Sequence, residues 1–186
     1  MIYLARHGQT QWNIEKRICG RADVPLTEEG YKQALLLAKQ AERLTQPITQ
    51  IICSPLIRAK ETAQIVANQL GLPITIDERL MEMDFGVYDG LPIQTQEFQK
   101  SRKEFSLPFE QGESILDVAG RIYPLLIELT SQENDKPLLV SHNAVSRVVD
   151  NYFNGKRMSE FLNFNIENTE LVAYRKTKLY TKVPIS

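Results

Sequence analysis

Short apolar runs alternate along this chain with longer segments whose apolar residues recur at helical spacing. Four runs have the length of buried strands, namely Ile2 to Ala5, Ile51 to Cys53, Pro73 to Ile76 and Leu138 to Ser141. A fifth, Leu171 to Lys176, is typical of an edge strand, and a polar tail follows it. Because strands alternate with helices, we predict an α/β fold, a three-layer α/β/α sandwich around a mostly parallel central sheet.

Two of the predicted helices lie between the early strands. The first begins after Thr27, a favourable N-cap, and the residues expected to face inward are Tyr31, Ala34, Leu35, Ala38, Ala41 and Leu44. For the second, Ser54 and Pro55 supply an N-cap and a first-turn proline, and Gly71 ends the helix. Its inward residues are expected to be Ala59, Ala63, Val66 and Leu70.

Two later helices follow an irregular stretch. Residues 77–109 contain two glycines and two prolines that interrupt regular structure, so we predict a lid or side region there. Another helix runs from about Ala144 to Phe153. Before it, a helix opens at Ser114, Pro124 is expected to bend it, and its inward residues are Ile115, Val118, Ala119, Ile122, Leu126 and Leu129.

Length and continuity favour one domain. The chain has 186 residues, of which 42% are hydrophobic and 24% charged, enough to fill a single core. No internal repeat, low-complexity tract or interdomain linker interrupts the sequence. We therefore expect residues 1–186 to form a single domain.

Charge and cysteine content restrict the partners. The formal net charge is −1, which provides no general attraction for nucleic acid or an anionic membrane. Any anion site must therefore be a local cluster, and the expected partner is a small molecule, with the oligomeric state left open. Two cysteines, Cys19 and Cys53, argue against a disulfide framework, and no signal segment or membrane-spanning run is evident. These features favour the cytoplasm.

Both histidines of the chain directly follow predicted strands. His7 lies within Arg6-His7-Gly8, and His142 follows Ser141. Ligands of open α/β sheets bind at the carboxyl ends of strands, and imidazole suits phosphoryl transfer or acid–base chemistry near neutral pH. A buried structural histidine is the alternative at each position. Arg6 and Gly8 favour function, because glycine allows the backbone to approach a ligand closely.

Taken together, the strand ends predict a phosphate pocket. Arg6, His7 and Asn13 come from the first loop, Arg58 from the first turn of the second helix, and His142 from the fourth strand. Guanidinium groups offer planar, permanently charged forks to phosphoryl oxygens, and helix N-termini add N–H groups. Considered alone, Arg58 also fits a solvated charge at a helix end.

A series of motifs lies in a recognisable order along nearly the whole chain. They are Arg6 to Asn13 (RHGQTQWN), Gly20 to Thr27 with Gly30, Ser54 to Ala59 (SPLIRA), Leu80 to Gly86 with Gly90, Gly112 to Ser114, and Val140 to His142. Together they resemble the histidine phosphatase superfamily, the phosphoglycerate-mutase-like proteins. The resemblance implies the fold of that family.

The same resemblance implies roles for the site residues. His7 becomes phosphohistidine, Arg6, Arg58 and His142 bind the phosphate, and Glu82 is the proton donor and later the base. A neutral imidazole is needed for attack on phosphorus, and neighbouring arginines disfavour protonation and stabilise the transition state. His142, if protonated, would add another positive donor.

Several assignments leave alternatives open. Asp84 is the competing acid to Glu82, although it is structural by default. Gly8 and Asn13 are expected phosphate contacts, and the alternative for Asn13 is a turn residue. Arg147 fits the family pattern or anchors the sheet edge or helix.

Two positions depart from the family pattern. Asn143 stands where glycine commonly follows the second histidine, and Cys19 precedes Gly20. Asparagine tolerates unusual backbone angles, so Asn143 is expected to preserve the turn and contact phosphate, with a reshaped pocket as the alternative. Cys19 is expected to fill space as a small apolar residue.

The interval between Glu82 and His142 bears on the reaction. Cofactor-dependent phosphoglycerate mutases of this family carry an extra segment there, whereas this interval is about sixty residues and must also hold a helix and a strand. We therefore predict a phosphomonoesterase that hydrolyses a small phosphorylated metabolite through phosphohistidine. The alternatives are a cofactor-dependent phosphoglycerate mutase and a noncatalytic phospho-ligand-binding module.

No metal or other cofactor is expected from the motifs. The sequence lacks His-Glu-x-x-His and paired Cys-x-x-Cys patterns and has two histidines. Recognition of the leaving group is expected within residues 77–109.

Overall fold

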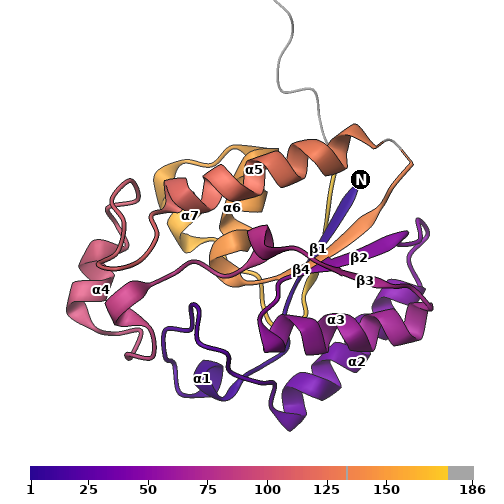
Figure 1. The fold of residues 1–186 in the computed structure, drawn as a ribbon, viewed down its shortest axis with the longest axis horizontal. Coiled ribbons are helices and arrows are strands. Elements are labelled where there is room, and N and C mark those ends of the chain that lie inside the picture. Colours follow the sequence, from indigo (N-terminus) through magenta and orange to yellow (C-terminus); the bar gives the residue numbers. More distant parts are fainter. Residues whose placement is uncertain (133, 176–186) are drawn as a thin grey trace, which may run out of the picture.

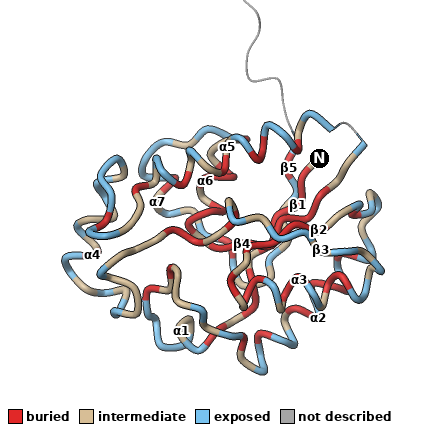
Figure 2. Tube along the Cα trace, viewed as in Figure 1, coloured by how far each residue is buried: buried red, intermediate tan, exposed pale blue. Residues whose placement is uncertain are grey.

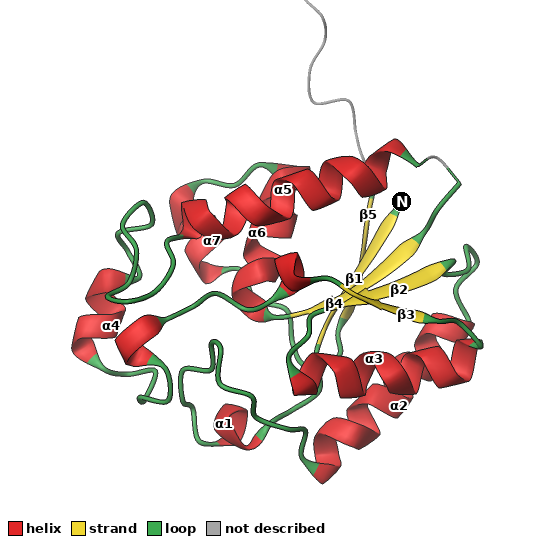
Figure 3. Cartoon of the chain, viewed as in Figure 1, coloured by secondary structure: helices red, strands yellow, loops and turns green. Residues whose placement is uncertain are grey.

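A five-stranded sheet forms the middle layer of the fold (Figure 1, Figure 3). The computed structural model describes residues 1–132 and 134–175, with strands β1 (Ile2–Arg6), β2 (Gln50–Cys53), β3 (Ile74–Ile76), β4 (Pro137–Ser141) and β5 (Leu171–Tyr174). The order is β3-β2-β4-β1-β5, in which β5 runs antiparallel to β1 and the other neighbours are parallel. The predicted strands and the mostly parallel sheet are confirmed, although Lys176 lies outside the described residues.

Helices cover both faces of this sheet. Figure 1 shows α2 (Glu28–Glu42) and α3 (Ile57–Leu70) on one face, and α5 (Ile115–Ser131), α6 (Asn143–Asn154) and α7 (Met158–Asn163) on the other. The shorter helices are α1 (Gln11–Ile14), α4 (Gln96–Ser101) and the 3-10 turns η1 (Glu78–Leu80) and η2 (Gly86–Tyr88). The three-layer α/β/α sandwich is therefore confirmed. Helix α7 was not predicted, because its 6 residues are too few to show a helical period.

Burial on both faces of the sheet explains the continuous apolar strand sequences. In β1, Ile2 and Leu4 join the core cluster beneath α5 and α6, whereas Tyr3 and Ala5 join the cluster beneath α2 and α3. Figure 2 shows the buried strands running through the centre of the molecule. Successive strand side chains point to opposite faces, so a strand covered on both sides needs apolar residues throughout.

The N-cap of α2 is as predicted, but its inward face differs. The Thr27 hydroxyl accepts the Gly30 N–H at 3.0 Å. Tyr31 and Leu35, expected inside, are 40% and 53% exposed, and Leu37 is buried instead. The buried stripe is dominated by small residues, and adjacent helical residues are about 100° apart, so Leu35 points away from it. The remaining buried members are Gly30, Ala34, Ala38 and Ala41, and Leu44 lies beyond the helix end.

Helix α3 begins two residues later than its sequence suggests. Its N-cap is Leu56 rather than Ser54, and the Asp23 carboxylate accepts the N–H of Ile57, the first helical residue, at 2.6 Å. The Ser54 hydroxyl accepts the Leu56 N–H at 3.3 Å and also pairs with His142, Oγ to Nε2, at 2.8 Å. Gly71 ends the helix in the left-handed region at φ 67°, as predicted. The expected inward residues Ala59, Ala63 and Val66 are buried, and Leu70 is partly buried.

The late helices match their predicted positions closely. Ser114 caps α5 in a reciprocal pair with Asp117, and Pro124 lies inside the helix. Helix α6 starts at Asn143, one residue earlier than expected. None of the helices in the described ranges is long and apolar enough to cross a membrane.

Candidate active site

The two histidines lie side by side because β1 and β4 are neighbouring parallel strands. Arg6 is in register with Ser141, and the His7 N–H donates to the Ser141 carbonyl at 3.0 Å. The imidazole centroids of His7 and His142 are consequently 5.1 Å apart. Both rings are buried at the carboxyl edge of the sheet.

The backbone orients the His7 ring. Its Nδ1 lies 2.7 Å from the Gly8 carbonyl oxygen. A carbonyl only accepts, so Nδ1 carries the proton in the neutral ring and Nε2 keeps its lone pair. Burial lowers the pKa of His7 well below its ordinary value, and Arg58 and Arg6 lower this pKa further. The ring is therefore neutral near pH 7, as nucleophilic attack requires.

His142 is buried and neutral as well. Burial, and then the Arg58 charge, lower the pKa of His142 well below its ordinary value. Its Nε2 pairs with the Ser54 hydroxyl, and its buried Nδ1 has no hydrogen-bond partner among the described residues. The positive charge considered for His142 is thus absent from the site as it stands, because burial opposes protonation.

Arg58 is fully buried, so its interpretation as a solvated helix-end charge is wrong. Its Nη1 and Nη2 donate to the carbonyls of Ala22 and Gly20, each at 2.8 Å. The Asp89 carboxylate accepts the N–H groups of the same two residues at 2.9 and 2.7 Å. Arg58 and Asp89 therefore hold the same loop, at Gly20 and Ala22, from two sides. The buried Nε of Arg58 is unpaired within the described part of the chain.

Arg6 is held by a distant loop that the sequence analysis missed. Its Nη1 donates to the Ile166 carbonyl at 3.0 Å, while its Nε is buried without a partner in residues 1–132 and 134–175. The Asn168 amide donates to the His7 carbonyl at 2.8 Å. No local signal marks Ile166, because it contributes only a main-chain oxygen.

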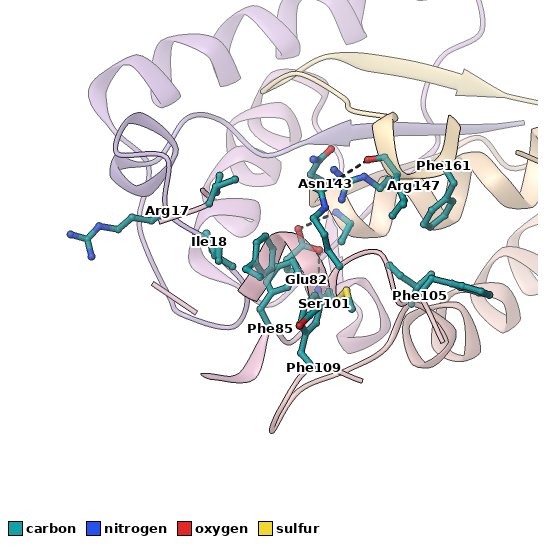
Figure 4. Close-up of a pocket in the computed structure, with 18 of the residues that line it drawn as sticks. Arg17, Ile18, Glu82, Phe85, Ser101, Phe105, Phe109, Asn143, Arg147 and Phe161 are labelled. Atoms are coloured by element: carbon teal, nitrogen blue, oxygen red, sulfur yellow. Dashed lines mark hydrogen bonds between the residues drawn. The ribbon is translucent and has the colours of Figure 1, made fainter. Parts of the chain in front are cut away.

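Glu82 and Asp84 occupy different environments. Glu82 is buried, and its carboxylate accepts the N–H groups of Met83 at 2.8 Å and Ala144 at 3.2 Å. It lines the same cavity as Arg6 and His7, and Figure 4 shows its carboxylate among the lining side chains. The Asp84 carboxylate instead accepts the Gly86 N–H in a local turn at 2.9 Å, and Asp84 does not line that cavity. Position therefore favours Glu82 as the acid.

The motif Gly112 to Ser114 supports the Glu82 segment. Both Glu113 carboxylate oxygens bind the Arg121 guanidinium at 3.0 Å. Arg121 in turn donates to the main-chain carbonyls of Arg79, Met81 and Glu82. Glu113 and Arg121 are therefore positioning residues for the Glu82 loop.

Several residues of the predicted site line one cavity of about 180 Å³. Arg6, His7, Asn13, Glu82 and Asn143 line it. The predicted residues Gly8, Arg58 and His142 do not line it, and the latter two are buried beside His7. Nearly half of the lining residues come from residues 82–109, within the segment expected to recognise the leaving group. Lining residues absent from the predicted set include Arg17, Ser101, Arg102 and Arg147.

For Gly8 and Asn143, both expected to contact phosphate, the structure shows packing and hydrogen-bonding roles within the protein. A Cβ on Gly8 would lie 2.5 Å from the Gly30 carbonyl oxygen, so packing against α2 requires this glycine rather than approach to a ligand. Asn143 has no left-handed φ and simply begins α6, so the expected special turn is wrong. Its Oδ1 accepts the Ile166 N–H at 3.3 Å.

Three further residues with alternative expectations line the cavity. Asn13 both lines the cavity and closes a turn, since its Oδ1 accepts the Thr10 N–H at 3.0 Å. Burial raises the pKa of the Cys19 thiol to about 11, so this lining residue is uncharged at neutral pH. Arg147 both lines the cavity and anchors its neighbourhood, since its Nε donates to the Phe164 carbonyl at 2.9 Å.

We expect the free energy of unfolding to fall on acidification below about pH 6.5. The pKa values of His7 and His142 are depressed in the folded state, so the unfolded chain binds more protons there. Each histidine should contribute up to about 1.4 kcal/mol per pH unit, until its folded pKa is reached. Urea unfolding between about pH 7.5 and pH 5 measures this slope. His142→Asn should reduce the slope, and an unchanged slope in that variant would contradict the assignment.

An α/β/α sandwich with two buried histidines, the buried Arg58 and the partly buried Arg6 at one sheet edge is the arrangement of phosphoglycerate-mutase-like proteins. Residues 2–179 match the family model of the histidine phosphatase superfamily (branch 1). The chain belongs to this superfamily, which confirms the resemblance drawn from its motifs.

Individual relatives carry different names. The chain is 40% identical over 149 residues to the probable phosphoglycerate mutase GpmB of Salmonella choleraesuis (strain SC-B67), covering 76% of this chain and 68% of that protein. Its fold is similar to a mycobacterial glucosyl-3-phosphoglycerate phosphatase, with TM-score 0.81, 27% identity and coverage of 91% and 90% of the two chains. It is also similar to a putative alpha-ribazole-5'-P phosphatase from Escherichia coli K-12, with TM-score 0.79, 25% identity and coverage of 91% and 87%.

Proposed function

We propose that this protein is a phosphomonoesterase that hydrolyses a small phosphorylated metabolite through a phosphohistidine on His7. The observation that carries the proposal is the neutral His7 ring, whose Nδ1 is held by the Gly8 carbonyl beside the Arg6 and Arg58 charges. Glu82 lines the same cavity and supplies an acid. The proposed site thus combines a nucleophile, positive charge and a proton donor.

Each proposed step uses groups already in place. His7 Nε2 attacks phosphorus while Glu82 gives a proton to the leaving oxygen, so the P–O bond breaks without releasing an alkoxide. Arg6 and Arg58 stabilise the phosphoryl oxygens by their positive charge. His142 accepts the Ser54 hydroxyl at Nε2 and donates its Nδ1–H to a phosphoryl oxygen. Glu82 then takes a proton from water, which attacks the phosphohistidine, releases phosphate and regenerates His7.

The competing function is a cofactor-dependent phosphoglycerate mutase, which the name of the Salmonella relative favours. Hydrolysis is supported by the phosphatase names of two structural neighbours and by the short interval between Glu82 and His142. We further propose that the reaction needs no metal. Among the described residues, no three histidine, cysteine, aspartate or glutamate side chains gather as a metal site would require.

The protein is expected to release phosphate from p-nitrophenyl phosphate in the presence of a chelator. It should interconvert 2- and 3-phosphoglycerate poorly, with or without bisphosphoglycerate, because water is the proposed acceptor of the phosphoryl group. Coupled assays of free phosphate and of isomerisation measure both activities. Rapid isomerisation that depends on bisphosphoglycerate, with little phosphate released, would instead establish the mutase. Phosphate-ligand binding without either activity would establish a noncatalytic module.

A further inference from the structure

The cavity beyond His7 and Glu82 has an aromatic wall. Its five phenylalanines are contributed by separate parts of the chain and include residues on α4 and α7. Figure 4 labels four of them, Phe85, Phe105, Phe109 and Phe161. Phe98 and Phe109 stack with ring centroids 5.5 Å apart. Phe85 packs edge-on against both, at 5.6 and 5.4 Å. The aromatic wall consists of Phe85, Phe98, Phe105, Phe109 and Phe161.

Several polar groups beside this aromatic wall already have protein partners. Arg102 donates to the Leu162 carbonyl at 3.1 Å, and Arg147 donates to the Phe164 carbonyl. Arg17 forms an ion pair with Glu15 at 2.6 Å. The five phenylalanine rings themselves offer no hydrogen-bond partner, so hydroxyl groups packed against them would lose hydration without replacing it. An apolar leaving group has no such loss.

The size of the cavity limits the leaving group. Its volume is about 180 Å³. A protein cavity of about 150 Å³ holds a benzene molecule. With the phosphoryl group at His7, the space suits about one ring or a chain of roughly six carbons.

We propose that the leaving group is an apolar alcohol, aromatic or aliphatic, that packs against the aromatic wall. This inference rests on the proposed phosphatase function and specifies its substrate class. Apolar burial strengthens binding by about fourfold for each methylene removed from water. The specificity constant should rise by a similar factor along a chain-length series.

The test uses n-alkyl phosphates from ethyl to octyl. Their leaving oxygens have nearly equal basicity, so rate differences report contacts with the chain. We expect kcat/KM to rise by about threefold to fourfold per methylene and to level off at roughly six carbons. Leu107 lines the cavity rim and is 62% exposed, so Leu107→Ala should flatten the series without threatening the core. The matched control is Leu35→Ala on α2, 53% exposed and outside the cavity, which should leave the series unchanged.

Two outcomes would overturn the inference while phosphatase activity remained. One is a kcat/KM that is flat or falls with chain length. The other is a preference for chains ending in a carboxylate over those ending in a methyl group. That result would show that Arg102 and Arg147, rather than the aromatic wall, bind the leaving group. If no ester is hydrolysed, the proposed function fails separately. Calorimetry with n-alkylphosphonates then tests the inference, since affinity must still rise with chain length.

Discussion

His7→Ala should lower kcat for p-nitrophenyl phosphate by on the order of 10⁴-fold or more, because removing a catalytic nucleophile eliminates the covalent route. The neutral ring presents Nε2 because the Gly8 carbonyl holds Nδ1 at 2.7 Å. Alanine supplies no nucleophile, while the charges of Arg6 and Arg58 remain. Rapid quench of the wild type with radiolabelled substrate into alkaline denaturant should trap phosphate on the protein that is stable in alkali, is released by acid and is absent from His7→Ala.

His142→Asn is the matched control for that experiment. His142 is the neighbouring buried imidazole, with its centroid 5.1 Å from that of His7. Its proposed role is to stabilise phosphoryl oxygens, so the variant should turn over slowly and still form phosphohistidine on His7. Wild-type turnover in His7→Ala, or labelling of His142 instead, would reject the proposed nucleophile.

Arg58→Lys should reduce kcat/KM by on the order of 100-fold or more, the usual effect of losing a preorganised charged donor. The reason differs from simple loss of charge. Two guanidinium nitrogens bind the carbonyls of Gly20 and Ala22 at 2.8 Å, which sets the direction of the buried Nε. A lysine ammonium is a point charge and cannot reproduce this planar arrangement.

The measurement for Arg58→Lys combines kinetics with thermal unfolding. Leaving buried carbonyls unpaired should also lower the stability, by about 1–3 kcal/mol, so rates are taken well below the unfolding transition. Arg43→Lys, at an exposed position after α2, is the control and should behave as wild type. A near-normal kcat/KM for Arg58→Lys would show that Arg58 does not act on the phosphoryl group.

The sheet was predictable because its signals are local. A run such as Ile51 to Cys53 is apolar throughout, and the structure buries it on both faces. Thr27 and Gly71 marked helix ends correctly, since capping depends on residues a few positions away. The side of α2 that faces inward was harder to predict. Tyr31 and Leu35 fit a helical stripe, but packing selected the neighbouring stripe of small residues.

The candidate site was also predictable only in part. Its motifs located Arg6, His7, Glu82 and His142 along the chain, and parallel pairing of β1 with β4 brings the two histidines together. Ser54 was predicted as a helix cap from its local sequence, and its hydroxyl does accept the nearby Leu56 N–H, but its shorter bond is to His142, 88 residues away. Strand order sets this partner, because β2 pairs with β4 and so brings Ser54 next to His142.

The sequence by itself determined the superfamily, the strands and longer helices, and the candidate site residues, because these depend on residue type and short-range spacing. Only the tertiary structure decided which groups hold those residues. Arg6 reaches the Ile166 carbonyl across 160 positions, and Arg58 grips the loop clamped by Asp89. Main-chain carbonyls have no residue-specific signal, and the aromatic wall joins segments far apart in the chain. Their contribution follows from packing, which a linear pattern does not encode.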